Sequence, residues 1–426
     1  MLSTILNAFQ VADIRKKIAF TAAMLLVYRL GSHIPVPGVN LTAVNNIQKE
    51  FGGGGILSYL NLFSGGGLSK LALFALGIMP YITASIILQL LQVVVPSLEK
   101  LSKEGEVGQA RITQYTRYLT VGLAFAQSIG YVFLFHSFQA KAGESVVTHF
   151  DAPHIFLIVV CLTTGCILLM WVGELITQRG IGNGISLMIF ASIVSRIPGG
   201  IQAWWDNPSQ VFRVIMPFIV FGVVAAVVFV QEGQRRIPIQ YAKRVIGRRM
   251  TQGTQTYLPL RVNMAGVIPV IFAASVMAIP PTVGQLIGQN RTGFGTDLYN
   301  FFAPGGWHYV VGECMLIIVF TYFYTAVTFN PVDQADSLKK YGGFIPGVRP
   351  GRPTAEFLDR ILARLTLPGA LFLAAIAALP TVLISQTGAN FAFGGTSILI
   401  VIGVALDTMK QLEAQLMMRN YEGFLK

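Results

Sequence analysis

The sequence predicts an all-α polytopic membrane protein with ten membrane-spanning helices. Hydrophobic residues make up 53% of the 426-residue chain and charged residues only 12%, whereas about 25% of an average soluble domain is charged. Apolar runs of about 20 residues, the length that a helix needs to cross a ~30 Å hydrocarbon core, recur along the chain. Lysine and arginine are concentrated in alternate loops between these runs, as is typical of membrane proteins with several spans.

The first apolar run, Ile18–Tyr28, follows the basic residues Arg15–Lys17 and precedes the Pro35–Gly38 turn. Secretory signal peptides begin with a similar order of charged and apolar residues, but no small-residue cleavage pattern follows this run. We therefore expect a retained first span whose terminal charges reach the membrane interface. The other predicted spans lie near residues 71–95, 113–136, 154–177, 184–203, 211–231, 264–287, 308–329, 365–385 and 394–416.

The charges predict the orientation of these spans. An even number of spans places both termini on one side of the membrane. With the N-terminus in the cytoplasm, 24 of the 31 lysines and arginines fall on the cytoplasmic side and seven on the other. This bias agrees with the positive-inside rule, so both termini are predicted to be cytoplasmic. The five histidines fall on the external side without zinc-like spacing, and no metal site is expected.

A glycine-rich stretch, from about residue 52 to residue 67, interrupts the pattern of full-length spans. The clusters Gly52–Gly55 and Gly65–Gly67 flank a short apolar run, Ile56–Phe63. A helix of this run is roughly 12 Å long, at ~1.5 Å per residue, and cannot cross the hydrocarbon core. Non-helical backbone at membrane depth must be buried in protein or line a watery cavity, so flexible glycines beside a half-helix predict an internal cavity. The alternative is an external surface loop with a short amphipathic helix.

The loop between spans six and seven, about residues 231–263, carries seven basic residues and one acidic residue. Strand-type residues in Ile237–Tyr241 and Thr254–Leu260 flank a turn at Gly247–Arg249, and this pattern predicts a basic β-hairpin.

The loop between spans eight and nine, about residues 330–364, is also basic. Its closely spaced prolines and glycines fix turns that hold Arg349 outward. Thr354 suits a helix N-cap, with Glu356 and Asp359 near the positive helix end. Both loops place arginines far from the spans, where a polyanionic partner can bind them. The alternative is that these charges only fix the membrane topology.

The sequence lacks the motifs of common enzymes. It contains no Walker A motif, no H-E-x-x-H and no G-x-S-x-G. Gly180–Gly184 lacks the spacing of a dinucleotide fingerprint and is interpreted as the turn and close-packed start of span five. Glu174, Glu313 and Asp407 lie near span ends, so no mid-membrane carboxylate pair is formed of the kind that coupled transporters need. We therefore expect no enzyme activity and no cofactor, and a passive pathway is favoured.

Six separated strings resemble the SecY family, and the resemblance covers nearly the whole chain. They are Gly77–Ile82, Gly180–Ser186, Ala242–Arg244 with Gly247–Arg249, Asn263–Pro269, Gly347–Gly351 and Gly394–Ser397. The resemblance implies the channel subunit of the bacterial protein-translocation complex in the cell membrane. It further implies two inverted halves of five helices, residues 1–203 and 204–426, clamped by a SecE-type subunit and often accompanied by a SecG-type subunit.

The resemblance also assigns site residues. The family's hydrophobic pore ring falls on Ile78, Ile82, Ile185, Ile189, Ile271 and Ile400. The half-helix becomes its plug, with Ile56, Leu57, Tyr59, Leu60, Leu62 and Phe63. The lateral gate lies between spans two and three on one side and spans seven and eight on the other, with Gln127 and Asn263 as polar contacts. Docking of the SecA ATPase or the ribosome falls on Lys243, Arg244, Arg248, Arg249 and Arg349. Spacing alone would place the isoleucines in ordinary lipid or core packing.

These observations together favour a passive protein-conducting channel. It would carry unfolded secretory polypeptides across the membrane and release signal sequences or transmembrane segments of nascent chains into the lipid. Energy would come from the SecA ATPase or the translating ribosome, whose ribosomal RNA is a polyanion. The alternative is an inverted-repeat secondary transporter of a small solute, with a broken helix at the glycine-rich stretch.

Overall fold

The computed structural model describes residues 11–40, 42–44, 46, 64–142, 146–147, 150–205, 210–241, 245–246, 249–250, 255–277, 279–280, 284, 295, 297, 301–302, 306–387 and 395–423. Its helices are α2 (Ala12–Gly31), the 3₁₀ turn η1 (Leu68–Lys70), α5 (Met79–Val94), α6 (Pro96–Lys103), α7 (Glu106–Ala142), α8 (Ala152–Arg179), α9 (Gly184–Val194), α10 (Ile197–Trp205), α11 (Gln210–Glu232), α12 (Ile268–Met277), α15 (Trp307–Thr328), α16 (Pro331–Lys340), α17 (Arg352–Thr387) and α18 (Gly395–Gly423).

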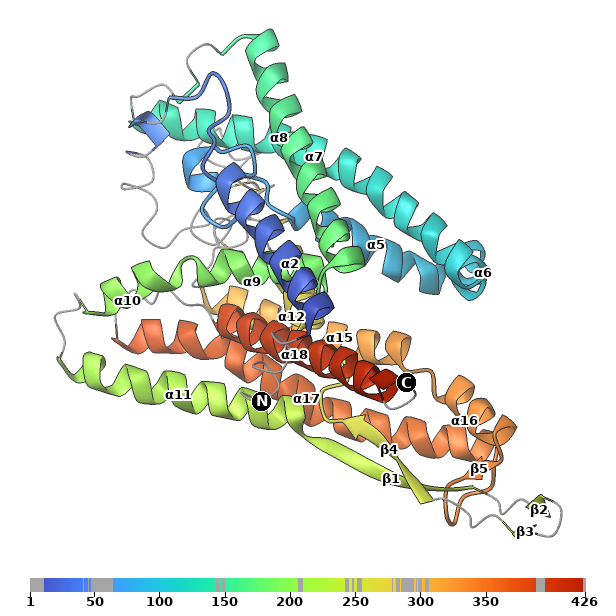
Figure 1. Cartoon of the computed structure of the whole chain (residues 1–426). Coiled ribbons are helices and arrows are strands. Elements are labelled where there is room, and N and C mark those ends of the chain that lie inside the picture. The colour runs from blue at the N-terminus through green and yellow to red at the C-terminus, as the bar shows by residue number, and fades with distance from the viewer. Residues whose placement is uncertain are drawn as a thin grey trace.

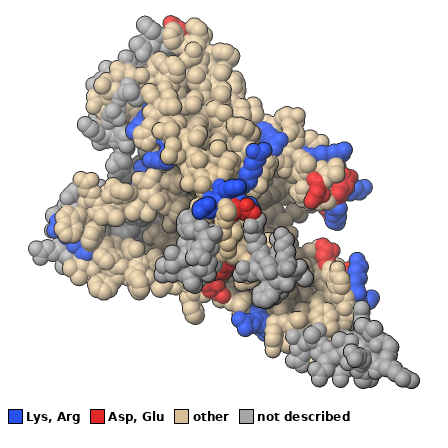
Figure 2. All heavy atoms as spheres, in the orientation of Figure 1, with Lys and Arg blue, Asp and Glu red and all other residues tan. Residues whose placement is uncertain are grey.

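The helices form two groups that meet at α9 and where α5 packs against α12 (Figure 1). One group contains α2, α5, α7 and α8, and the other contains α11, α12, α15, α17 and α18. Helix α9 contacts α2 and α8 of the first group and α18 of the second. Uncharged residues cover most of the face in Figure 2, where charged side chains gather in separate groups, one of them around α6.

Six helical segments among the described residues are long and apolar enough to cross a membrane. The pair α5 and α6, whose axes differ by 100°, would make a seventh span. Helix α2 carries four basic residues, Arg15 to Lys17 and Arg29, and the described part of α12 is only 10 residues long. The chain is therefore a mostly helical polytopic membrane-type protein, and the count of ten spans stays a prediction.

The expected start of span two at residue 71 is wrong. Helix α5 begins only at Met79, because the preceding backbone turns repeatedly. Leu71 and Gly77 have left-handed φ values of 41° and 57°, which a regular helix does not contain. The segment instead bonds to the chain after α2: the Leu73 N–H donates to the Ile34 carbonyl over 2.8 Å. An apolar composition alone could not reveal this turn structure.

The predicted basic hairpin is confirmed. Strands β1 (Gln234–Tyr241) and β4 (Gln255–Arg261) pair antiparallel, and β2 (Val245–Ile246) pairs with β3 (Arg249–Met250) nearer the tip. The sequence did not indicate that β5 (Gly343–Phe344), from the next basic loop, adds to the free edge of β1. The order β4-β1-β5, called here the loop sheet, therefore joins the two basic loops.

The loop sheet has a small hydrophobic core of its own. Ile237, Leu260 and Ile345 pack against Leu358 and Ile361 of α17, apart from the main core of the helices. The expected N-cap at Thr354 is wrong, since α17 already begins at Arg352. The Thr354 hydroxyl, buried in the first turn, donates to the Arg349 carbonyl over 2.8 Å instead.

A bidentate ion pair crosses the interface between α7 and α8. Arg117 donates from Nε to Oε1 of Glu174 over 2.9 Å and from Nη2 to Oε2 over 2.6 Å. The Glu174 side chain is only 13% exposed, so its charge depends on this partner. On α6, by contrast, Lys103 and Glu99 form a fully exposed pair, and hydrogen bonding to Lys103 lowers the pKa of Glu99.

Replacing Arg117 with alanine should destabilise the packing of α7 on α8. The mutation leaves a mostly buried carboxylate without its partner, which costs about 1–3 kcal/mol. Thermal denaturation of the purified protein in detergent should show a lower Tm. Lys103→Ala, which removes the exposed pair, should leave the Tm unchanged; equal effects of the two variants would contradict a structural role of the Arg117 pair.

Candidate functional site

The predicted ring isoleucines lie in the main core, on four helices that pack in succession. Helix α5 packs against α12, α12 against α18, and α18 against α9. Five of the six isoleucines are at most 5% exposed and Ile185 is partly buried. The six residues are Ile78 and Ile82 at the start of α5, Ile185 and Ile189 on α9, Ile271 on α12 and Ile400 on α18.

The circuit of helices closes through α8. A Cβ on Gly173 of α8 would lie 3.7 Å from Cδ1 of Ile78 and 3.4 Å from Cγ1 of Ile185. These two isoleucines, which are far apart in the sequence, therefore meet at the same glycine. The side chains that meet here are apolar, and a narrow apolar constriction excludes water and ions by dewetting.

Local sequence explains why the isoleucines sit at helix starts. Ile78 is the N-cap residue of α5 and Pro80 occupies its first turn, where proline is tolerated because the N–H is not needed. Asn183 caps α9 by accepting a hydrogen bond from the Ile185 N–H over 3.1 Å. The prediction that residues 180–184 form a turn and a close-packed helix start is confirmed, since a Cβ on Gly184 would lie 2.1 Å from the Gly173 carbonyl oxygen.

Sequence reasoning missed a contact between α5 and α12 beside the ring. The Ser275 hydroxyl lies 3.8 Å from the Met79 sulfur and donates to the Ile271 carbonyl over 2.8 Å. Both residues are buried. Ser275 follows Ile271 by four residues, so helical spacing could have placed it on the same face. The contact links the two helices that flank the predicted lateral gate.

The predicted plug residues Ile56, Leu57, Tyr59, Leu60, Leu62 and Phe63 lie outside the described residues. The end of the glycine-rich stretch is described, and Gly65 is part of a buried turn. Arg29 Nη1 donates to the Gly65 carbonyl over 2.8 Å, and a Cβ on Gly65 would lie 2.5 Å from the Tyr28 hydroxyl. The Tyr28 hydroxyl is itself hydrogen-bonded to Ser192 of α9. Hydrogen bonding and burial hold Gly65 in this turn, and its φ of 62° is one that glycine adopts readily. The movement expected of the glycine cluster stays a prediction.

The predicted gate residues do not touch each other. Gln127 is partly buried on α7, while Asn263 is 5% exposed just before α12 and donates from Nδ2 to the Gly266 carbonyl over 2.9 Å. Their side chains make no hydrogen bond to each other among the described contacts.

The predicted docking residues are only partly described. Arg349 is exposed between Gly347 and Gly351, whose φ values of 82° and 103° form the turns expected for this loop. Lys243, Arg244 and Arg248 lie outside the described residues. Arg249 belongs to β3, but its side chain is not described.

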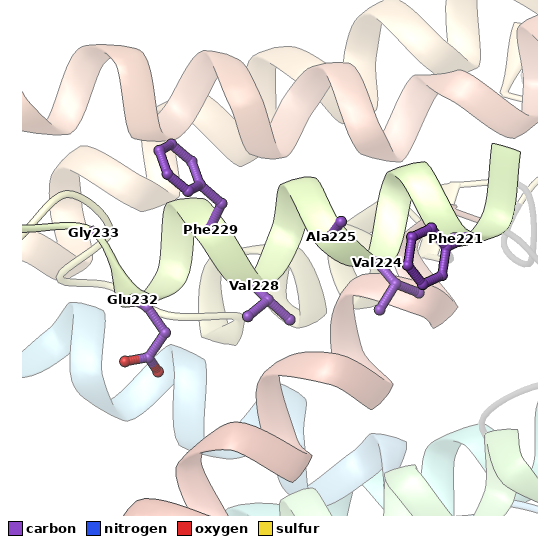
Figure 3. A pocket seen from close by; sticks show the side chains of 7 residues that line it. All are labelled: Phe221, Val224, Ala225, Val228, Phe229, Glu232 and Gly233. Atoms are coloured by element: carbon purple, nitrogen blue, oxygen red, sulfur yellow. The ribbon is translucent and has the colours of Figure 1, made fainter. Parts of the chain in front are cut away.

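A shallow apolar pocket lies along α11, away from the ring (Figure 3). Phe221, Val224, Val228 and Phe229 line it, and Glu232 and Gly233 close its end where β1 begins. Its lining offers no catalytic set of polar groups. Among the described residues, no cluster of three or more His, Cys, Asp or Glu side chains could hold a metal ion.

Known proteins resemble this chain along its full length. Residues 72–409 match the SecY family. The protein translocase subunit SecY of Streptomyces galbus is 50% identical over a 442-residue alignment that covers 100% of both chains. That of Mycobacterium tuberculosis strain H37Rv is also 50% identical with the same coverage.

Solved structures share the fold. A protein-conducting channel has a TM-score of 0.63 at 19% identity, covering 93% of this chain and 91% of the other. Sec61 from the canine ribosome–channel complex has a TM-score of 0.59 at 18% identity, with the same coverage. The relatives give no support to the solute-transporter alternative. Because half of the aligned residues are identical over the full length of both chains, this chain belongs to the SecY family, whose members are protein translocase subunits rather than enzymes.

Proposed function

We propose that this chain is a passive protein-conducting channel in which the six isoleucines form the seal. The observation that carries this proposal is the burial of these side chains where α5, α9, α12 and α18 meet. Unfolded secretory polypeptides pass through the ring, and transmembrane segments leave sideways into the lipid. Reconstitution of the purified chain with its partners in liposomes tests this function: ATP-dependent import of a precursor is expected, and ion-driven uptake of a small solute would contradict it.

An apolar ring suits this task for a physical reason. Flexible aliphatic side chains can fit around passing polypeptides of any sequence, because dispersion contacts are non-directional. They offer no hydrogen bonds that would hold the passing chain. When no chain is present, the same side chains close on each other and exclude water and ions.

The proposed topology has ten spans in two inverted halves, residues 1–203 and 204–426. Both termini and both basic loops then lie on the cytoplasmic side of the cell membrane, as the distribution of lysine and arginine favours. The lateral gate lies between α5 and α7 on one side and α12 and α15 on the other, near Gln127 and Asn263. The contact between Met79 and Ser275 supports α5 and α12 as neighbours across this gate.

The proposed partners follow from charge and from the family. Small SecE-type and SecG-type subunits accompany the channel, while a SecA-type ATPase or the ribosome supplies the energy. The loop sheet supports this docking role, because it holds both basic loops in one rigid unit with its own core. Sec61, which shares the fold, occurs in a ribosome–channel complex.

Replacing Ile271 or Ile400 with asparagine should weaken the seal. A polar amide wets the constriction, and about 2–3 kcal/mol of apolar burial per large side chain is at stake. Ion conductance of proteoliposomes should rise, and precursors with defective signal sequences should be exported more readily. Ile400→Val keeps the site apolar and should show neither change; unchanged conductance in both asparagine variants would count against the ring.

Reversing the charge of Arg349, or of Arg248 together with Arg249, should slow translocation while the channel stays folded. Arg349 is exposed and adds little to the packing. Phosphate contacts of the loop arginines to ribosomal RNA would make ribosome binding depend on salt. Binding of the SecA-type ATPase and of ribosomes to the purified channel should weaken. Lys141→Glu, on the predicted external side, serves as the control. Wild-type affinity for both partners would mean that these charges fix only the topology.

Deleting Leu57–Asn61 should raise ion leak without abolishing export. Helical spacing gives Ile56, Tyr59, Leu60 and Phe63 one common face, which can cover the external side of the ring. The ring still seals partly without this segment, so precursor import should continue. Conductance of proteoliposomes measures the leak, and a deletion with wild-type conductance would identify the segment as a surface loop.

A further inference from the structure

The two strands of the basic hairpin leave the helical part of the protein at adjacent points. Gln234, the first residue of β1, pairs with Arg261, the last residue of β4. The Val262 N–H also donates to the Gly233 carbonyl over 2.9 Å. This junction, called here the hairpin root, comprises residues 232–234 and 261–263. A movement of the loop sheet reaches the helices through it.

The hairpin root is held between two helices of the second group. On one side, the Val262 carbonyl oxygen approaches α17 so closely that a Cβ on Gly369 would lie 2.8 Å from it. On the other side, Nζ of Lys410 on α18 lies 2.7 Å from Oε1 of Glu232. Glu232 points away from the pocket-lining Phe229 on the opposite side of α11 (Figure 3).

A further charged residue of α18, Asp407, lies within electrostatic range of the root. Asp407 interacts electrostatically with Arg261 and Lys410, which attract it, and with Glu232, which repels it. Its Oδ2 would lie 4.0 Å from a Cβ on Gly266, in the segment that leads into α12. The root therefore carries one acid, Glu232, and one base, Arg261, and α18 carries one base, Lys410, and one acid, Asp407.

The charges on α18 lie on the same helix face as the proposed ring residue Ile400. Asp407 follows Ile400 by seven residues, which is two helical turns, so both residues lie on the same face of α18 at a rise of about 10 Å. A displacement of α18 by a fraction of this distance moves Ile400 within the seal. Helix α11 also packs on α18, with Nε2 of Gln231, the residue before the root, at 3.1 Å from a Cβ position on Gly403.

We propose that Glu232, Arg261, Asp407 and Lys410 are positioning residues that transmit movement of the loop sheet to the ring helix α18. The inference rests on the proposed docking of an energy-supplying partner to the basic loops. The ion pair between Glu232 and Lys410 and the electrostatic attraction between Asp407 and Arg261 resist separation of the hairpin from α18, so a partner that tilts the sheet also shifts the helix. The charges act through α18 and do not touch the passing polypeptide.

The test separates partner binding from turnover. The full translocase is reconstituted in liposomes with Lys410→Glu, which replaces the partner of Glu232 with a second acid, and with the swapped pair Glu232→Lys plus Lys410→Glu. The concentration of the SecA-type ATPase that gives half-maximal import should stay within about twofold of wild type. The maximal import rate per folded channel should fall about fivefold, as expected for a loss of a partly exposed ion contact, and the swap should restore it.

Lys103→Glu is the matched control, since it reverses a lysine in an exposed pair of the same 2.7 Å length on α6. It should change neither quantity. A wild-type maximal rate in Lys410→Glu, or no recovery in the swapped pair, would overturn the inference. The docking proposal fails separately, if the Arg349 and Arg248 variants bind the partner with wild-type affinity. If the root variants still lose import rate in that case, the coupling stands and the partner docks elsewhere.

Discussion

Backbone hydrogen bonding is the constraint on which the rest of this structure depends. Inside a bilayer no water is available for a free N–H or C=O, so the chain can leave the helical state only where protein surrounds it. The non-helical segment between Ser64 and Ile78 meets this condition. It is largely buried, and it exchanges hydrogen bonds with the chain after α2, for example from the Val36 N–H to the Leu71 carbonyl over 3.0 Å. Gly165 of α8 allows the Leu73 carbonyl oxygen to come close, since a Cβ on this glycine would lie only 2.0 Å from that oxygen.

The place of the proposed isoleucine ring depends on this segment. Because the chain forms no α-helix between Ser64 and Ile78, α5 begins next to two of the proposed ring residues, as do α9 at Gly184 and α12 at Ile268. The first N–H groups of each helix have no helical acceptor and need another partner. At α9 these are the Asn183 side chain and the Thr177 hydroxyl, which accepts from the Gly184 N–H over 2.9 Å. At α9, polar groups thus satisfy the helix start, and the isoleucines of this helix remain free to pack in the apolar core.

The sequence predicted the parts of the fold that have a strong local pattern. The hairpin was predicted from strand-type residues around a turn, and the helical, membrane-type class from the length of the apolar runs. The start of α5 was not predictable, since Leu71–Gly77 is as apolar as a helix and only tertiary hydrogen bonds select its turns. The pairing of Gly343–Phe344 with β1 was equally hidden, because two residues carry no periodicity. Isoleucines spaced by four look alike in a seal and in a core, and only the family resemblance grouped them.

The two larger hydrophobic cores of the described residues divide the protein into two parts. The main core contains the isoleucines of the proposed ring, and the core under the loop sheet contains residues of both basic loops. Helix α17 passes through both, with Leu358 and Ile361 in the sheet core and Leu373 and Ala374 in the main core. Pro368 lies between these positions and removes one backbone hydrogen bond from the helix, which weakens its resistance to bending there. A bend at this point would let the sheet move, so the proposed transmission to the isoleucine ring would need contacts beside α17, such as those of the hairpin root between α17 and α18.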